Sequence, residues 1–88
     1  MILLIQGLED VEYKNKAGKD VSGLTVYGVI TEEDYPRPKL TGQRTFEQYF
    51  SGKRSCDYET GQEYELKFVV KKFNGEYHAY PDDLVLVD

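Results

Sequence analysis

The chain of 88 residues has no tryptophan, one cysteine and one histidine. The single Cys56 excludes a disulfide within the chain, and one cysteine with one histidine, His78, does not make a zinc site. No apolar run approaches membrane-spanning length, and the opening Met1–Ile5 is too short and lacks the basic flank of a signal peptide. The sequence therefore predicts a cytoplasmic protein without a membrane segment.

Catalytic motifs are also missing. The chain has no glycine-rich phosphate loop, no Gly-x-Ser-x-Gly sequence and no metal triad. His78 is interpreted as a structural or surface residue, and Cys56 has no partner motif. The carboxylates fall in loops and turns, where solvation explains them. We therefore expect no enzymatic activity and no cofactor.

Positive charge is in deficit, because 11 Lys and Arg face 16 Asp and Glu, which gives a net charge of −5. This balance argues against a surface covered by nucleic acid, since phosphate affinity comes largely from Lys and Arg. Both signs are grouped along the chain, however, so a divided surface is possible. The eight Tyr and four Phe exceed what a small core can cover. Several rings should be exposed, as at a protein interface or a platform for stacked bases.

Two long hairpins are predicted by apolar residues at every second position. A strand over residues 1–13, bent near Gly7, and a second over Val21–Thr31 enclose a polar turn with three lysines, in which Gly18 can be left-handed. The second hairpin places Tyr64, Leu66, Phe68 and Val70 on one face and turns at Asn74-Gly75, typical of a type I′ turn. Its return strand, Glu76–Tyr80, should be broken by Pro81-Asp82-Asp83. Leu84–Val87 then follows as a short closing strand, which needs cover on both faces or an end position in a closed barrel.

Between the hairpins, Glu32–Thr41 is predicted to be a loop, stiffened by Pro36 and Pro38 around Arg37. Residues 43–50 fit either a helix or a strand, and we favour a strand because the surroundings are β. The whole chain, residues 1–88, is then one all-β domain. The expected architecture is a small five-stranded OB-like barrel with long hairpins and at most one short helix.

Three turns combine cations with aromatic rings or a flexible tip, and they are the candidate nucleic-acid contacts. Lys14, Lys16 and Lys19 at the first hairpin tip could follow a phosphate backbone, or could keep the hairpin soluble. Tyr35 beside Arg37 and Lys39 suits stacking with phosphate neutralisation, or the ring packs under its own loop. Lys71, Lys72 and Phe73 precede the second turn, where the ring could instead pack across a dimer interface.

In layout, the chain resembles the single-stranded DNA-binding proteins of filamentous phages, which are small dimeric OB-fold replication proteins. The resemblance rests on length, a Met-Ile start, the basic turn Asn15–Lys19, Tyr27 in its strand, and Asp34-Tyr35-Pro36. It also includes Gly61-Gln62-Glu63-Tyr64 and the ending Asp83-Leu84-Val85-Leu86-Val87. The chain departs from that family in its acidity and in extra residues around Arg37–Arg54.

The resemblance implies a homodimer through the C-terminal hairpin and sequence-independent binding of single-stranded DNA during replication of a phage or mobile element. By position, Lys16 and Lys19 match the basic tip, Tyr35 the stacking tyrosine and Phe73, approximately, the ring of the last turn; Tyr27 belongs to the same set. RNA remains open as a ligand. The main alternative is an acidic protein–protein interaction module on the same barrel, and an acidic DNA mimic is a third possibility.

Overall fold

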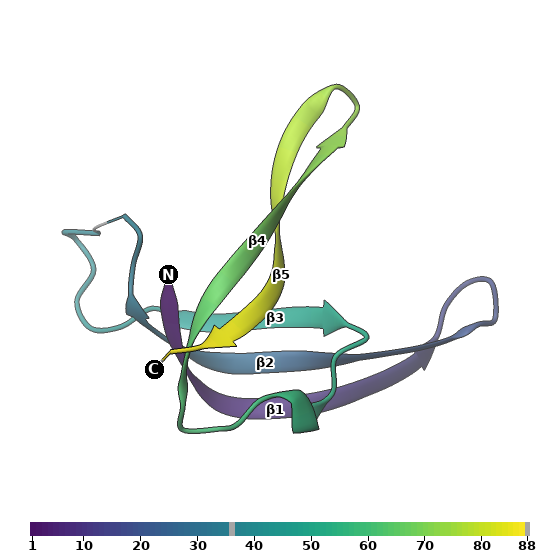
Figure 1. Ribbon diagram of the computed structural model, residues 1–88, viewed down its shortest axis with the longest axis horizontal. Helices are drawn as coiled ribbons and strands as arrows, with labels where there is room; N and C mark the ends of the chain where they lie inside the picture. Colours follow the sequence, from purple (N-terminus) through teal and green to yellow (C-terminus); the bar gives the residue numbers. More distant parts are fainter. Residues whose placement is uncertain (36, 88) are drawn as a thin grey trace.

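The computed structural model describes residues 1–35 and 37–87 and shows five antiparallel strands in one sheet (Figure 1). The strands are β1 (Ile2–Lys14), β2 (Asp20–Glu32), β3 (Thr45–Ser51), β4 (Glu63–Phe73) and β5 (Glu76–Leu86), with a 3-10 helix, η1 (Ser55–Asp57), before β4. Their order in the sheet is β3-β2-β1-β4-β5. The all-β prediction with at most one short helix is confirmed. Within the described residues the end strands β3 and β5 are not paired with each other, so closure into a barrel stays a prediction.

The β1–β2 hairpin follows the sequence pattern closely. Ile5 pairs with Gly28 and Gly7 with Tyr27, so Gln6 is an extra residue and the expected bend near Gly7 is a bulge. At the far end, Gly18 has a φ of 76°, the left-handed conformation expected of it. The hairpin extends well beyond the rest of the sheet (Figure 1), and we call residues 14–20 the wing tip.

The strand that we favoured for residues 43–50 is confirmed as β3, which begins two residues later, at Thr45, and pairs along β2 from Gly23–Ser51 to Val29–Thr45. Leu24 and Val26 pair with Phe50 and Gln48, which brings Phe50 into the core. The helical interpretation of this segment is wrong. Its apolar pattern was too short to distinguish a helix from a strand, and the strand forms because the segment pairs with β2. The loop predicted over Glu32–Thr41 is confirmed for residues 33–35 and 37–41, whereas Glu32 still belongs to β2 and the loop continues to residue 44. The stiffening expected from Pro36 lies outside the described residues.

The β4–β5 hairpin corrects one prediction. The turn is as expected, with φ of 50° at Asn74 and 82° at Gly75. The return strand, however, does not break at Pro81: β5 is continuous from Glu76 to Leu86, and no separate closing strand follows. Phe68 pairs with Pro81 and Lys67 with Asp83, so Asp82 is an extra residue that forms a bulge in β5. Pro81 is tolerated because β5 lies at the edge of the sheet.

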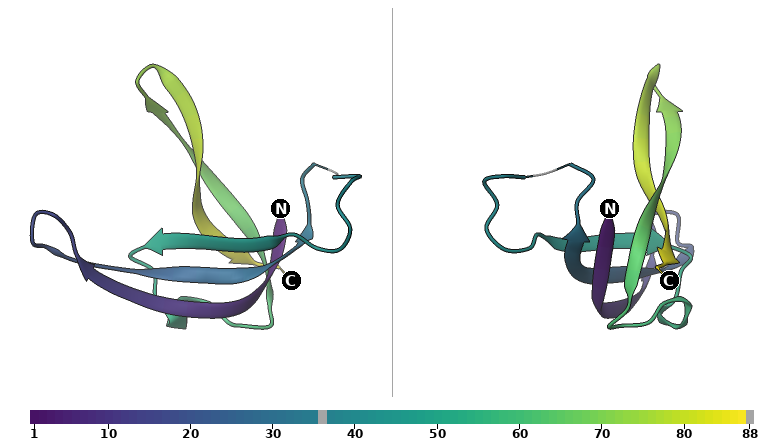
Figure 2. Two further views of the ribbon diagram at one scale, coloured as in Figure 1. Left: turned by 180° about the vertical axis from the view of Figure 1, so that it is seen from behind. Right: turned by 60° about the vertical axis from the view of Figure 1, so that its left-hand side comes forward.

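The core lies between the inner face of β1, β2 and β3 and the base of the β4–β5 hairpin. It consists of buried apolar and tyrosine side chains: Leu3, Ile5, Leu24, Val26, Phe50, Tyr58, Tyr64, Leu66 and Leu84. Above this base the hairpin leaves the sheet, as both views in Figure 2 show. Phe68 and Val70 share a face with Tyr64 and Leu66, but they are 47% and 63% exposed.

Within one chain this face of the hairpin is therefore covered only at its base, around Tyr64 and Leu66. The closing residues also lack the predicted cover on both faces, because Leu84 is buried while its neighbours Val85 and Leu86 are exposed.

Side-chain hydrogen bonds fasten the segment between β3 and β4 across the core. The backbone N–H and hydroxyl of Ser55 donate to the two carboxylate oxygens of Asp10, at 2.9 and 2.7 Å. These bonds hold the pKa of Asp10 below its usual value. The Tyr58 hydroxyl donates to Asp83 Oδ1 at 2.5 Å, and its ring packs edge-on against Tyr64. This segment thereby closes the lower side of the core.

Candidate nucleic-acid interface

The structure places the predicted contact residues, except Tyr27, at three separate corners of the molecule. In Figure 1 the wing tip, the loop of residues 33–44 and the tip of the β4–β5 hairpin point in different directions. The molecule measures 45 × 36 × 24 Å along its principal axes, so these corners do not form one continuous site. A strand that contacts all of them would have to wrap around the molecule or bridge more than one copy.

The wing tip is a compact, ordered turn. The Asn15 side-chain oxygen accepts hydrogen bonds from the backbone N–H groups of Ala17 and Lys19, each at 3.0 Å. The Lys16 and Lys19 side chains project from this turn into solvent. Lys14 is not part of the turn itself. It ends β1, and its register partner across the neck of the hairpin is Asp20.

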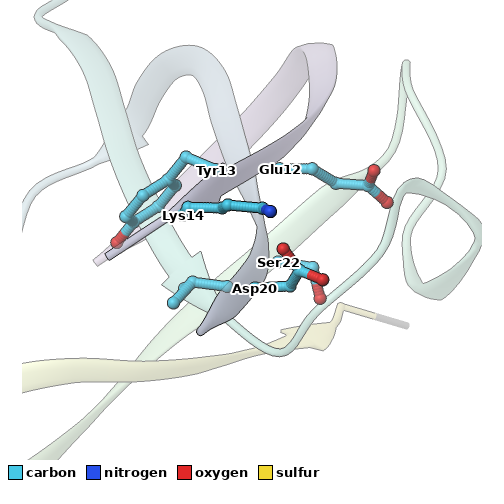
Figure 3. A pocket seen from close by; sticks show the side chains of 6 residues that line it. Glu12, Tyr13, Lys14, Asp20 and Ser22 are labelled. Carbon is cyan, nitrogen blue, oxygen red and sulfur yellow. The ribbon is translucent and has the colours of Figure 1, made fainter. Parts of the chain in front are cut away.

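That neck carries one lysine and two carboxylates on one side. Figure 3 shows Glu12 and Lys14 on the same side of the ribbon as Ser22 and Asp20, with Tyr13 turned to the other side. The carboxylates of Glu12 and Asp20 thus lie on the same side of the neck as Lys14. The positive charge of the wing tip therefore comes chiefly from Lys16 and Lys19.

The loop of residues 33–44 contributes the most exposed ring among the described residues. Tyr35 is 83% exposed, and together with Arg37 it lines an open pocket of about 430 Å³. Phe68 and Ala79 of the β4–β5 hairpin line the same pocket, although they are far from the loop in sequence. The fold thus brings two aromatic rings and a guanidinium to one cavity, and Lys39 is exposed on the same loop.

The acidic residues of this pocket are paired. The guanidinium of Arg44 donates two hydrogen bonds to the carboxylate of Glu33, at 2.8 and 3.0 Å. Asp34 pairs with the amino group of Met1. Arg37 has no ion-pair partner among the described residues, so it supplies the uncompensated charge. The chain is acidic as a whole, yet this pocket carries a free cation beside exposed rings.

The tip of the β4–β5 hairpin presents Lys71, Lys72 and Phe73, all exposed as predicted. The Lys72 ammonium lies 5.6 Å from the centre of the Tyr77 ring, a cation–π contact. Phe73 pairs with Glu76 beside the Asn-Gly turn, is 64% exposed and lies outside the core formed by the described residues. This tip therefore offers a ring and cations to a partner rather than to its own domain.

Tyr27 lies apart from the other candidates. It is on the outer face of β2, 37% exposed, and its hydroxyl donates to Glu9 Oε1 at 3.1 Å. Glu47 pairs beside it on β3, and the two carboxylates, Glu9 foremost, raise the pKa of Tyr27. An anionic backbone would meet these carboxylates first, so Tyr27 is a weak candidate for phosphate-neutralised stacking.

Sequence reasoning missed two tyrosines that share the face of Tyr27. Tyr49 pairs beside Thr25 and its ring lies over Gly23, where an added Cβ would be 2.2 Å from the Tyr49 hydroxyl oxygen. Tyr13 continues this face toward the wing tip. The sequence signal for Tyr49 is the alternation of a strand. If residues 46–50 form a strand, Tyr49 lies on the face of the sheet that does not carry Phe46 and Phe50.

Comparisons of the chain with protein-family models, with curated proteins and with solved structures found no match. In residues 1–35 and 37–87 no group of His, Cys, Asp and Glu side chains is arranged to hold a metal ion. Over the same residues, no helix has the length and apolar character needed to cross a membrane.

Proposed function

We propose that the protein binds single-stranded nucleic acid without reading its sequence, and acts in DNA replication of a phage or mobile element. One observation carries the proposal: Tyr35, 83% exposed, shares an open pocket with Arg37 and Phe68. Exposed rings stack on bases of any identity, and a nearby guanidinium neutralises a phosphate. The paired acids of the pocket leave that cation uncompensated.

The remaining cations support the same proposal. Lys16, Lys19, Lys39, Lys71 and Lys72 are exposed, and none has an ion-pair partner within the described part of the chain. Other cations of this acidic chain are paired: Lys53 with Asp83, Lys67 with Glu65 and Arg44 with Glu33. The unpaired cations are thus concentrated at the turns, where a flexible strand could reach them.

Fluorescence anisotropy of a labelled oligo-dT tests this proposal. Tyr35→Ala should weaken binding by about 1–3 kcal/mol, the cost of losing one stacked base. Tyr35→Phe keeps the ring and should bind as wild type does. Because Tyr35 is exposed, both variants should melt at the wild-type temperature. Absence of binding at low salt, or equal affinity of Tyr35→Ala and Tyr35→Phe, would contradict the proposal.

A second function, the protein-interaction module, is favoured by the uncovered β4–β5 hairpin. Phe68, Val70, Ala79 and Pro81 form an apolar patch on one of its faces, and Phe68 and Val70 are strongly exposed. Exposed apolar surface of this kind marks an interaction site. A homodimer through the C-terminal hairpin would cover this patch, including Phe68 and Ala79 at the edge of the Tyr35 pocket. The dimer contact and a stacked base would therefore compete for Phe68, whereas the wing tip would stay open to nucleic acid.

A further inference from the structure

The outer face of the three-stranded part of the sheet has a distinct chemistry. Alternation places Leu24, Val26 and Phe50 in the core and their neighbours outside. The rungs of this outer face contain three tyrosines and two glutamates: Tyr13, Tyr27, Tyr49, Glu9 and Glu47. We call these five residues the tyrosine face. Lysine and arginine are absent from the paired outward positions of β1, β2 and β3.

Rings with carboxylates and no cation suit a positively charged ligand. The face of a tyrosine ring attracts ammonium and guanidinium groups, and a neighbouring carboxylate adds a direct ion pair. Glu47 pairs with Tyr27 in register, and Glu9, the register partner of Thr25, accepts the hydrogen bond of the Tyr27 hydroxyl. The Tyr49 ring lies over Gly23 and adds to the ring surface. A phosphate backbone would be repelled here. The face therefore requires a partner with lysines or arginines.

The wing tip has the complementary properties. Lys16 and Lys19 are exposed, and neither has an ion-pair partner in residues 1–35 and 37–87. Asn15 holds the turn in one conformation through its two side-chain hydrogen bonds and its backbone bond with Lys19. Because the turn is already ordered, docking it would cost little conformational entropy.

A chain cannot dock its own wing tip on its own tyrosine face. Tyr27 shares its rung with Gly7, and Lys14 lies seven residues further along an extended strand, roughly 23 Å away. The tip points away from the sheet in Figure 1. We propose that the tyrosine face of one copy binds the wing tip of a second copy, with Lys16 and Lys19 pairing with Glu9 and Glu47.

Such a contact joins two different surfaces, so it is heterologous and repeats from copy to copy. It does not use the apolar patch of the β4–β5 hairpin and can extend pairs formed there into longer chains. A contact made by one turn on one sheet face is small and is expected to be weak on its own. It would be strengthened when several copies bind the same nucleic-acid strand. It does not depend on the proposed function, because it forms without nucleic acid.

Complementary charge reversals test the contact by sedimentation velocity at low salt without nucleic acid. The tip variant is Lys16→Glu/Lys19→Glu and the face variant is Glu9→Lys/Glu47→Lys. Wild type should sediment faster as its concentration rises, and each variant alone should lose this rise. An equimolar mixture of both variants should recover it, because the acidic tip now meets a basic face. All samples retain the β4–β5 hairpin, so a pair formed there is common to them.

Three results would overturn the proposal: a wild type whose sedimentation does not change with concentration, variants that assemble as wild type does, or a mixture that does not recover. Circular dichroism melting of each variant checks that the fold is retained. The oligo-dT experiment with Tyr35 variants is read separately, so failure of one proposal leaves the other measurable.

Discussion

At the residue scale, Tyr58 joins the segment after β3 to β5. Its hydroxyl donates to Asp83 at 2.5 Å, and Lys53 approaches the same carboxylate at 3.5 Å. Tyr58→Phe keeps the ring in the core but leaves this carboxylate without its closest donor. We expect a loss of about 1–2 kcal/mol in the free energy of unfolding by urea. Tyr13→Phe, which removes a hydroxyl with no hydrogen bond in the described residues, should leave it unchanged.

The same pair should make stability depend on pH. Tyr58, with the Leu84 N–H and Lys53, holds the pKa of Asp83 below its ordinary value, against the opposing effect of burial. Its contribution is therefore present above about pH 4 and is lost as pH falls through the lowered pKa. Burial first, and then Asp83, raise the pKa of Tyr58, so its contribution is present below about pH 10 and is lost above. Urea unfolding of Tyr58→Phe should show a weaker decline on both sides.

Two glycines differ in what surrounds them. A Cβ at Gly28 would lie 2.3 Å from the backbone oxygen of Leu4, which is fixed by the sheet. A Cβ at Gly23 would meet the ring of Tyr49, which can rotate away. Gly28→Ala should therefore lower the free energy of unfolding by about 2–3 kcal/mol, and Gly23→Ala by less. Thermal melting measures the difference, and equal losses would show that the backbone at Gly28 can shift.

At the scale of elements, the hairpins and their turns follow from local patterns. The bulge near Gly7 and the Asn74-Gly75 turn were predicted because each depends on the conformational needs of a few neighbouring residues. The continuity of β5 through Pro81 was not, because it depends on the position of β5 at the sheet edge, which the sequence does not show. The pocket between Tyr35 and Phe68 was not predicted either, because it forms between a loop and a hairpin that are far apart in sequence.

The β4–β5 hairpin carries its own prediction. Val70 is 63% exposed, so Val70→Glu should not destabilise the single chain, but it places a charge in the apolar patch. We expect light scattering after size exclusion to give the mass of a dimer for wild type and of a monomer for this variant. Val85→Glu, at an exposed position on the other face, should keep the dimer mass. A monomeric wild type would contradict homodimerisation through this hairpin.

At the scale of the whole molecule, the net charge is negative, but the charge at the turns is locally positive. The value of −5 follows from composition, but the sequence could not show which cations are neutralised. The structure pairs Arg44, Lys53 and Lys67 with acids and leaves the cations of the turns unpaired. The interpretation of Tyr27 as a nucleic-acid contact changes most, because its carboxylate neighbours Glu9 and Glu47 come from other strands and could not be located from the sequence.

This distribution predicts the salt dependence of binding. If the unpaired Lys16, Lys19, Arg37 and Lys39 contact about 4 phosphates, the logarithm of the affinity for oligo-dT should fall with the logarithm of salt concentration with a slope of about −2.8. Lys16→Ala/Lys19→Ala should reduce the magnitude of the slope by about 1.4. Lys67→Ala removes a cation already paired with Glu65 at 3.3 Å and should leave the slope unchanged. Equal effects of the two changes would mean that net charge, rather than the cations of the turns, governs affinity.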